Sequence, residues 1–308
     1  MKKTFINHIS VRWIFPAIFS LFFLYGCEQE QKNYQPSVTQ KSSSQQQKIY
    51  IFSIHPLHNP TRLHDVFGPV LSYLSKNIDN AEFQLEASRN YASYDEKLYA
   101  GKSHFSLPNP YQTINSLKHG YRVFGKMGDD ENFRGIILVR KDSNIKTVED
   151  LKGKAVSFPA PTALAATMLP QYYLKTHGLD VMNDIDNRYV GSQESSIMNV
   201  YLGNVAAGAT WPPPWNALKK ERPELAENLV IKWQTQSLPN NGLVVRNDVP
   251  AELVEQVSEL LFNLHTHKEG QKILQKIELS KFEPATNKTY QSVNDFIEIF
   301  STNVRKLD

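Results

Sequence analysis

Residues 148–162 read Val-Glu-Asp-Leu-Lys-Gly-Lys-Ala-Val-Ser-Phe-Pro-Ala-Pro-Thr, and this stretch is the strongest indication of the architecture. It predicts a helical turn that ends at Gly153, a strand over residues 155–158, and a proline turn into a new helix. That order places the start of a helix at the carboxyl end of a strand. The first N–H groups of a helix lack partners within the helix and carry positive partial charge. The stretch therefore predicts a site for an anion or a polar group.

Strands and helices alternate on both sides of this stretch. Before it, the apolar patterns predict strands at 48–54, 83–87 and 104–107, and helices at 61–76, 94–100 and 112–119. They also predict a strand at 135–140 before it, and strands at 188–190, 205–209, 229–233 and 242–246 after it. Helices are predicted at 162–176, 194–202, 216–222, 251–265, 270–277 and 293–304. Such alternation is typical of an α/β fold.

The N-terminus has the features of a secretory signal. Basic residues precede an apolar run at 13–25, which is 13 residues long, whereas a membrane-spanning helix needs about 20. The run ends in Leu24-Tyr25-Gly26-Cys27, which resembles a bacterial lipobox. The resemblance implies that residues 1–26 form a lipoprotein signal peptide and that Cys27 carries a diacylglycerol anchor. The alternative is an ordinary secretory signal with a chance cysteine.

Composition limits the function of the remaining chain. Cleavage before Cys27 removes three basic residues, so Lys plus Arg falls from 34 to 31, equal to the 31 acidic residues. A neutral protein gives no reason to expect a nucleic-acid partner. Cys27 is the only cysteine, so its acylation excludes disulfides, zinc thiolates and cysteine nucleophiles. Residues 27–47 are polar and almost without aliphatic side chains, which predicts a flexible tether.

Catalytic and metal-binding motifs are not evident. The sequence has no Gly-x-Ser-x-Gly elbow, phosphate loop or His-Glu-x-x-His motif, so we do not expect an enzyme. His55, His58 and His64 lie within ten residues, but no acidic residue stands at helical spacing to two of them. No metal and no cofactor is implied.

Most of residues 48–303 resembles the substrate-binding proteins of phosphate, phosphite and phosphonate ABC transporters. The resemblance is carried by residues 61–63, 89–92, 107–111, 148–170 and 191–194. It implies an α/β, two-lobed periplasmic-binding-protein fold of type II-like topology, with a ligand cleft between the lobes. Lobe one is expected to comprise residues 48–134 and 240–308, and lobe two residues 135–239. The two hinge crossings are expected near residues 133–136 and 236–241.

Candidate ligand-binding residues stand at strand ends and helix starts within these segments. They are Tyr91, Asn109, Tyr111, Thr162, Ala163, Ser192, Gln193, Glu194 and Trp211. Each also has a plainer interpretation: a loop aromatic, a chain turn, a helix cap or core packing.

Several positions depart from the family pattern. The family's Ser-Thr-Ser cluster corresponds here to Thr162-Ala-Leu-Ala165, and Gln193 stands where the family often has His. The strand at 205–208 lacks an Asp that the family often shows. The ligand therefore stays open between a small oxyanion and a less polar molecule held by Trp211, Trp215 and Tyr111.

The resemblance implies capture of a small anionic solute by lobe closure and its delivery to an ABC permease. The protein is expected to be a monomer in the bacterial cell envelope, lipid-anchored and facing the periplasm or the exterior. Two alternatives belong to other classes. One is a ligand-sensing input to a membrane kinase, and the other is a small-molecule lyase on the same scaffold.

Overall fold

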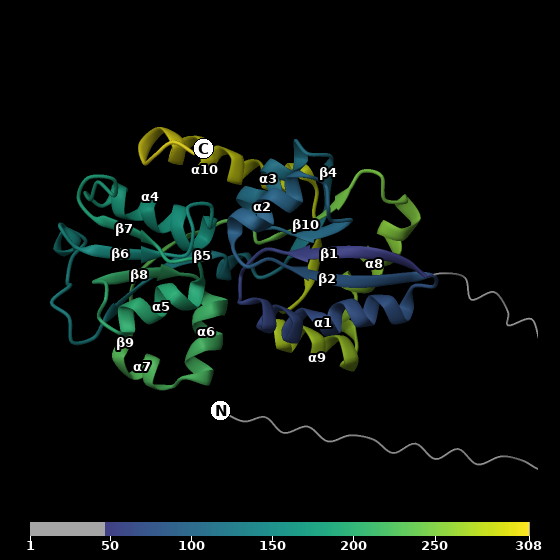
Figure 1. The fold of residues 1–308 in the computed structure, drawn as a ribbon, viewed down its shortest axis with the longest axis horizontal. Coiled ribbons are helices and arrows are strands. Elements are labelled where there is room, and N and C mark those ends of the chain that lie inside the picture. Colours follow the sequence, from purple (N-terminus) through teal and green to yellow (C-terminus); the bar gives the residue numbers. More distant parts are fainter. Residues whose placement is uncertain (1–46, 308) are drawn as a thin grey trace, which may run out of the picture. The chain divides into compact units, whose positions relative to one another are not determined.

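The computed structural model describes residues 47–307, in which helices pack on two separate β-sheets (Figure 1). The first sheet has the order β11 (Phe282–Pro284), β4 (Tyr121–Met127), β10 (Gly242–Arg246), β3 (Phe105–Leu107), β1 (Lys48–Ile54) and β2 (Ala81–Ala87). The second has the order β7 (Asp186–Tyr189), β6 (Ala155–Phe158), β8 (Ala207–Thr210), β5 (Arg134–Arg140) and β9 (Leu229–Ser237). We call each sheet with its helices a lobe.

Both sheets mix parallel and antiparallel pairs. In the first lobe β1 pairs in parallel with β2 and β3, whereas β10 runs antiparallel to β3 and β4. In the second lobe β6 is parallel to β7 and β8, whereas β5 is antiparallel to β8 and β9. Because the parallel strands of each sheet end at one edge, the loops that follow them gather there.

Helices cover these sheets through apolar faces. The first lobe carries α1 (Pro60–Asn77), α2 (Tyr91–Tyr99), α3 (Pro110–Leu117), α8 (Ala251–Phe262) and α9 (Lys268–Ile277). The second carries α4 (Leu169–Thr176), α5 (Gln193–Tyr201), α6 (Pro212–Glu221) and α7 (Glu224–Asn228). In α1, buried Leu63, Phe67 and Leu74 recur at helical spacing, and Asn59 caps the start by accepting from the Arg62 N–H at 3.0 Å. None of the helices within residues 47–307 combines the length and apolar character needed to span a bilayer.

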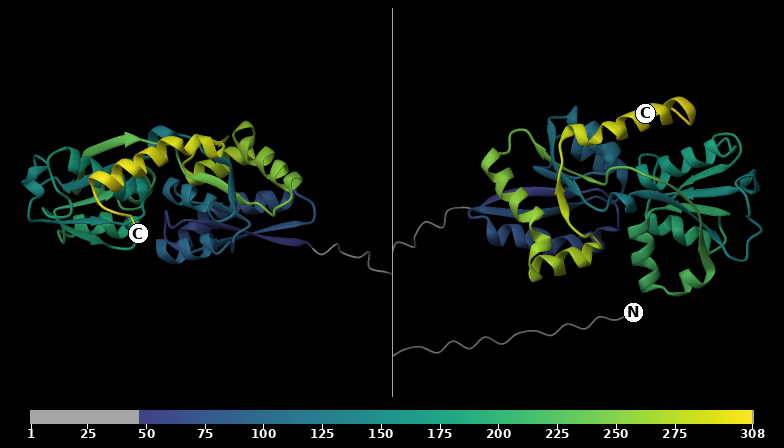
Figure 2. Two further views of the ribbon diagram at one scale, coloured as in Figure 1. Left: turned by 90° about the horizontal axis from the view of Figure 1, so that it is seen from above. Right: turned by 180° about the vertical axis from the view of Figure 1, so that it is seen from behind.

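The C-terminal helix α10 (Gln291–Asn303) contacts elements of both lobes. It packs against α3 and α4, and the rings of Phe296 and Tyr172 meet edge to face with centroids 5.6 Å apart. Beyond the helix, the Arg305 guanidinium donates to the Pro161 carbonyl oxygen at 2.6 Å. Figure 2 shows this helix in yellow from two further directions.

Local differences from the predicted elements have identifiable causes. The helix after Thr162 begins at Leu164, and its first turn is a π-turn in which the Ala163 carbonyl oxygen accepts from the N–H groups of Thr167 and Met168. Helix α6 begins at Pro212, because prolines are tolerated in a first turn, where their missing N–H groups need no partner. The strands β4 and β11 were not predicted.

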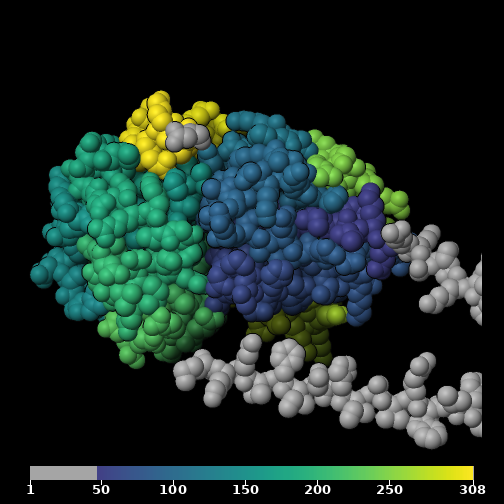
Figure 3. Space-filling view, viewed as in Figure 1, coloured from purple at the N-terminus to yellow at the C-terminus, as the bar shows by residue number. Residues whose placement is uncertain are grey.

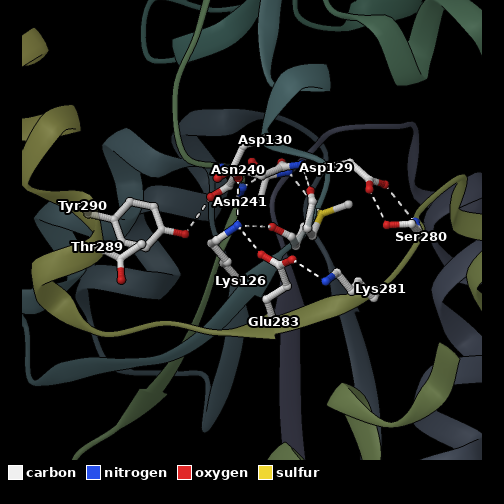
Figure 4. A network of polar contacts seen from close by, with 12 residues as sticks. Lys126, Asp129, Asp130, Asn240, Asn241, Ser280, Lys281, Glu283, Thr289 and Tyr290 are labelled. Atoms are coloured by element: carbon white, nitrogen blue, oxygen red, sulfur yellow. Dashed lines mark hydrogen bonds and ion pairs between the residues drawn. The ribbon is translucent and has the colours of Figure 1, made fainter. Parts of the chain in front are cut away.

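The chain crosses between the lobes at residues 128–133 and 238–241, and a polar network joins these crossings (Figure 4). Lys126 is 6% exposed, and its Nζ lies 2.8 Å from both Asp130 Oδ1 and Glu283 Oε2. Asp130 Oδ1 also accepts from the Asn240 N–H at 2.9 Å, and Asn240 Nδ2 donates to the Gly128 carbonyl oxygen at 2.7 Å. Burial lowers the pKa of Lys126, but its hydrogen bonds to both carboxylates outweigh this effect and raise the pKa overall. Lys126 therefore stays charged. From β4 it binds Asp130 in the first crossing, and Asp130 in turn binds Asn240 in the second.

Replacing Lys126 with methionine is expected to lower the free energy of unfolding by about 2–3 kcal/mol. The carboxylates of Asp130 and Glu283 would both lose the cation with which they pair. Lys281→Met is a matched control, since Lys281 pairs with the same Glu283 but its side chain is 47% exposed. The control should cost less than about 0.5 kcal/mol. Urea unfolding of both variants measures the difference, and equally small losses would contradict a structural role for Lys126.

Candidate ligand site between the two lobes

A small cavity lies where loops of both lobes meet. Its volume is about 10 Å³, and it is lined by His55, Tyr91, Asn109, Phe133, Ala163, Leu164, Ala165, Ala166, Gln193 and Trp211. Except for Phe133, which lies in a crossing, these residues follow the carboxyl ends of strands in the two sheets. In the space-filling view, the surfaces of the two lobes meet along this boundary (Figure 3). The geometry is that of a ligand site enclosed by two lobes.

Backbone N–H groups form the main donors on the second-lobe wall. The N–H groups of Leu164, Ala165 and Ala166 precede the first hydrogen bond of the π-turn, and within the described chain none has a backbone acceptor. The π-turn continues directly into α4, so the aligned peptide dipoles place positive partial charge at this end. The side chains at 163, 165 and 166 are all alanine methyl groups, so little side-chain bulk surrounds these N–H groups, which suits an anion or a polar oxygen.

His55 supplies an uncharged ring to the first-lobe wall. Its Nδ1 lies 2.9 Å from the Leu107 carbonyl oxygen, so Nδ1 carries the proton and Nε2 is left as an acceptor. Burial lowers the pKa of His55 to about 4, although the hydrogen bond to Leu107 opposes this shift. His55 is therefore neutral at neutral pH. It offers the Nε2 acceptor of a neutral ring and not the positive charge of a protonated one.

Tyr91 and Gln193 meet across the cavity from opposite lobes. Gln193 Nε2 donates to the Tyr91 hydroxyl at 3.3 Å, and Gln193 Oε1 accepts from the Thr210 hydroxyl at 2.9 Å. Because Tyr91 accepts from Gln193, its own proton is available to a ligand. Burial raises the pKa of Tyr91, so the phenol keeps that proton. Tyr91 is thus a neutral donor held in place by the second lobe.

Asn109 joins the lobes beside the same cavity. Its Oδ1 accepts from the Gln112 N–H at 3.1 Å and its Nδ2 donates to the Thr162 carbonyl oxygen at 3.0 Å. The side chain therefore caps α3 and reaches across to the loop before the π-turn.

The rest of the lining is apolar and carries no formal charge. Trp211 and Phe133 meet edge to face with centroids 5.5 Å apart. Within the described chain, no lysine or arginine lines the cavity. Any anion here would be held by dipoles and neutral donors, which favours low charge density over a fully ionised group.

Five of the nine predicted ligand residues line this cavity: Tyr91, Asn109, Ala163, Gln193 and Trp211. The other four lie outside its lining. Thr162 hydrogen-bonds Asn109, Ser192 caps α5 by accepting from the Ser195 N–H at 3.0 Å, and Glu194 accepts from Asn59 at 3.0 Å. Tyr111 lines a separate surface groove beside α10.

Reasoning from the sequence missed His55, Phe133 and the 164–166 backbone. His55 directly follows β1, just as Asn109 closely follows β3. Its position at a strand end could therefore have identified it as a candidate ligand residue. It was considered only as a metal ligand, and among residues 47–307 no three His, Cys, Asp or Glu side chains are placed to hold a metal ion. The aromatic wall is built by Trp211 and Phe133, whereas Trp215 is buried in the second-lobe core.

Two α/β lobes, two crossings and a site between strand ends define the class of two-lobed solute-binding proteins. The family of phosphonate ABC transporter periplasmic substrate-binding proteins matches residues 52–290, and the chain belongs to this family.

Solved structures share the fold. The binding protein component of an ABC phosphonate transporter from Pseudomonas aeruginosa has a TM-score of 0.77 at 17% identity, over 83% of this chain and 88% of that chain. PhnD1 from Prochlorococcus marinus, in complex with methylphosphonate, has a TM-score of 0.76 at 20% identity, and the match covers 84% of this chain and 99% of that chain. XAC2383 from Xanthomonas citri, bound to ATP, has a TM-score of 0.66 at 14% identity, and the match covers 83% of this chain and 99% of that chain.

Proposed function

We propose that this protein captures a small phosphorus oxyanion, or a related small anion, outside the cytoplasm and delivers it to an ABC importer. The observation that supports the proposal is that one cavity between the lobes is lined by Tyr91 and by Leu164, Ala165 and Ala166, whose N–H groups have no backbone acceptor within the described chain. Family membership supports a role in binding and transport, without chemistry on the ligand. The relative in complex with methylphosphonate suggests the class of ligand.

Capture is proposed to work by lobe closure. Hydrogen bonds from Asn109 to Thr162 and from Gln193 to Tyr91 join the lobes beside the cavity, and Arg62 near the start of α1 lies 2.6 Å from Glu221 at the end of α6. A cavity of about 10 Å³ is at the lower limit for one water molecule, so a solute would enter with the lobes further apart. A ligand that contacts both walls stabilises the closed form by its differential affinity, and a permease can recognise that form.

The wall chemistry favours a ligand with one charge and a small apolar group. Backbone donors and Tyr91 would hold the oxygens, and neutral His55 would accept from a protonated oxygen. Trp211 and Phe133 would pack against the apolar group. A dianion lacks a compensating cation in this lining. We therefore expect the monoanionic form of a short alkylphosphonate to bind better than the dianion.

Membrane attachment is part of the proposal. Residues 1–26 would be removed, Cys27 would carry the lipid, and residues 27–47 would be the tether; Cys27 lies outside the described residues. A monomeric body on such a tether could reach a permease in the same envelope.

Thermal unfolding of the purified protein tests the ligand class. The panel comprises phosphate, phosphite, methylphosphonate, aminoethylphosphonate, sulfate and propanesulfonate. A ligand at about 100 times its dissociation constant adds about 2.7 kcal/mol of stability. We expect a clear rise in the melting temperature with at least one phosphorus oxyanion. No rise with any anion would contradict the proposal and point to an uncharged ligand.

A further inference from the structure

Three buried side chains form a relay of hydrogen bonds from the second sheet to the cavity. The Thr210 hydroxyl at the end of β8 donates to Gln193 Oε1 at 2.9 Å, and Gln193 Nε2 donates to the Tyr91 hydroxyl at 3.3 Å. Tyr91 and Gln193 line the cavity, whereas Thr210 does not. Thr210 and Gln193 belong to the second lobe and Tyr91 to the first, so the relay is complete only when the lobes meet.

The burial of these groups determines the direction of the relay. The exposed fraction is 0% for Thr210, 2% for Gln193 and 4% for Tyr91, so bulk water does not replace a missing partner. Among residues 47–307, Gln193 Oε1 is the only hydrogen-bond partner of the Thr210 hydroxyl. A reversed amide would donate to Thr210 and leave the buried Thr210 proton without an acceptor. The amide oxygen therefore faces Thr210, and the amide N–H faces Tyr91.

This direction leaves the Tyr91 proton without an acceptor in the part of the chain that the structure describes. There the Tyr91 hydroxyl accepts from Gln193 and makes no other hydrogen bond. Burial raises the pKa of Tyr91, so the proton stays on the phenol. A buried donor without an acceptor costs free energy, which an anionic ligand oxygen would recover. The N–H that donates to Tyr91 would also polarise the hydroxyl and strengthen its bond to the ligand.

We propose that Thr210 is a positioning residue that makes Tyr91 a hydrogen-bond donor to the ligand. Thr210 acts through the Gln193 amide. Without the Thr210 hydroxyl the amide could reverse, and Tyr91 would then donate to Gln193 Oε1 in place of the ligand. The inference rests on the proposed function, because it assigns the direction of a hydrogen bond in the same site.

The first experiment needs no ligand. Nuclear Overhauser contacts of the Gln193 side-chain amide protons are recorded in the purified protein and in Thr210→Val, which keeps the shape and removes the hydroxyl. In the native protein these protons should lie beside the Tyr91 ring. In Thr210→Val they should turn toward the methyl groups at position 210, and Thr210→Ser should keep the native contacts. Amide protons that face Thr210 in the native protein, or that stay beside Tyr91 in Thr210→Val, would overturn the proposal.

Dissociation constants for methylphosphonate connect this direction to capture. Thr210→Val should raise the dissociation constant about tenfold, as expected for one lost hydrogen bond to a charged oxygen. Thr210→Ser restores the hydroxyl and should stay within about threefold of the native value. Tyr91→Phe removes the donor itself and should weaken binding about as much as Thr210→Val.

The double variant decides whether Thr210 acts through Tyr91. In the Tyr91→Phe background, Thr210→Val should change the dissociation constant by less than about twofold, because the donor is already absent. Single losses that multiply to about 100-fold would show that Thr210 acts independently of Tyr91 and would overturn the proposal. If the native protein does not bind methylphosphonate, this ligand is excluded, and the amide contacts still decide the role of Thr210.

Discussion

Replacing Ala163 with aspartate is expected to abolish anion binding while the protein stays folded. Ala163 stands at the cap of the π-turn, and a capping carboxylate would accept from the N–H groups of Ala165 and Ala166. These are the donors that we assign to the ligand. A fixed negative charge in the cavity would also repel an anion. The dissociation constant should rise more than about 100-fold, which corresponds to about 2.7 kcal/mol.

Ala163→Asn is the matched control for this charge. Asparagine has nearly the same size and also caps a helix, but it is neutral. We expect it to weaken binding by only about tenfold, through crowding and partial competition for the same N–H groups. Calorimetric titration of both variants measures the difference. Equal losses for the two would show that charge at the start of this turn is irrelevant and would contradict the proposed anion site.

Replacing Gly135 with alanine should destabilise the protein and weaken binding together. Gly135 is buried at the start of β5, and a Cβ there would lie 2.6 Å from the Ala165 carbonyl oxygen and 2.6 Å from Pro170 Cγ. The backbone of the cavity-lining turn would have to move, because no flexible side chain can give way. We expect the free energy of unfolding to fall by about 2–3 kcal/mol.

The control is Gly68→Ala in the middle of α1, where a Cβ would meet no atom within 4 Å. It should raise the stability by about 0.5–1 kcal/mol, because alanine favours the helix. Chemical denaturation gives both free energies. A Gly135→Ala protein as stable as the parent would show that the turn at Ala165 can shift freely, against our account of a fixed donor wall.

Much of the fold could be predicted because its signals are local. The strands at 48–54, 155–158 and 242–246 have the predicted bounds, since each is apolar and ends at a charged residue, proline or histidine. Strand β4 was missed because Lys126 makes its end look solvent-exposed, although the side chain is buried and pairs with nearby Asp130 and with distant Glu283. Strand β11 is three residues long and has no periodicity to detect.

The lining of the cavity could be predicted only in part, for a similar reason. The rule that sites form at strand ends led to Tyr91, Asn109 and Gln193, which meet there. It does not identify Leu164 to Ala166, because their contribution is made by backbone N–H groups and not by side chains. It also does not lead to Phe133, which reaches the cavity from a crossing.

A crystal structure of the protein grown with methylphosphonate tests the central claim most directly. We predict that the ligand lies between the lobes, with its oxygens within hydrogen-bonding distance of the N–H groups of Leu164 to Ala166 and of the Tyr91 hydroxyl. Its methyl group should face Trp211. A ligand bound elsewhere, or oxygens that contact neither the 164–166 backbone nor Tyr91, would contradict the proposed site.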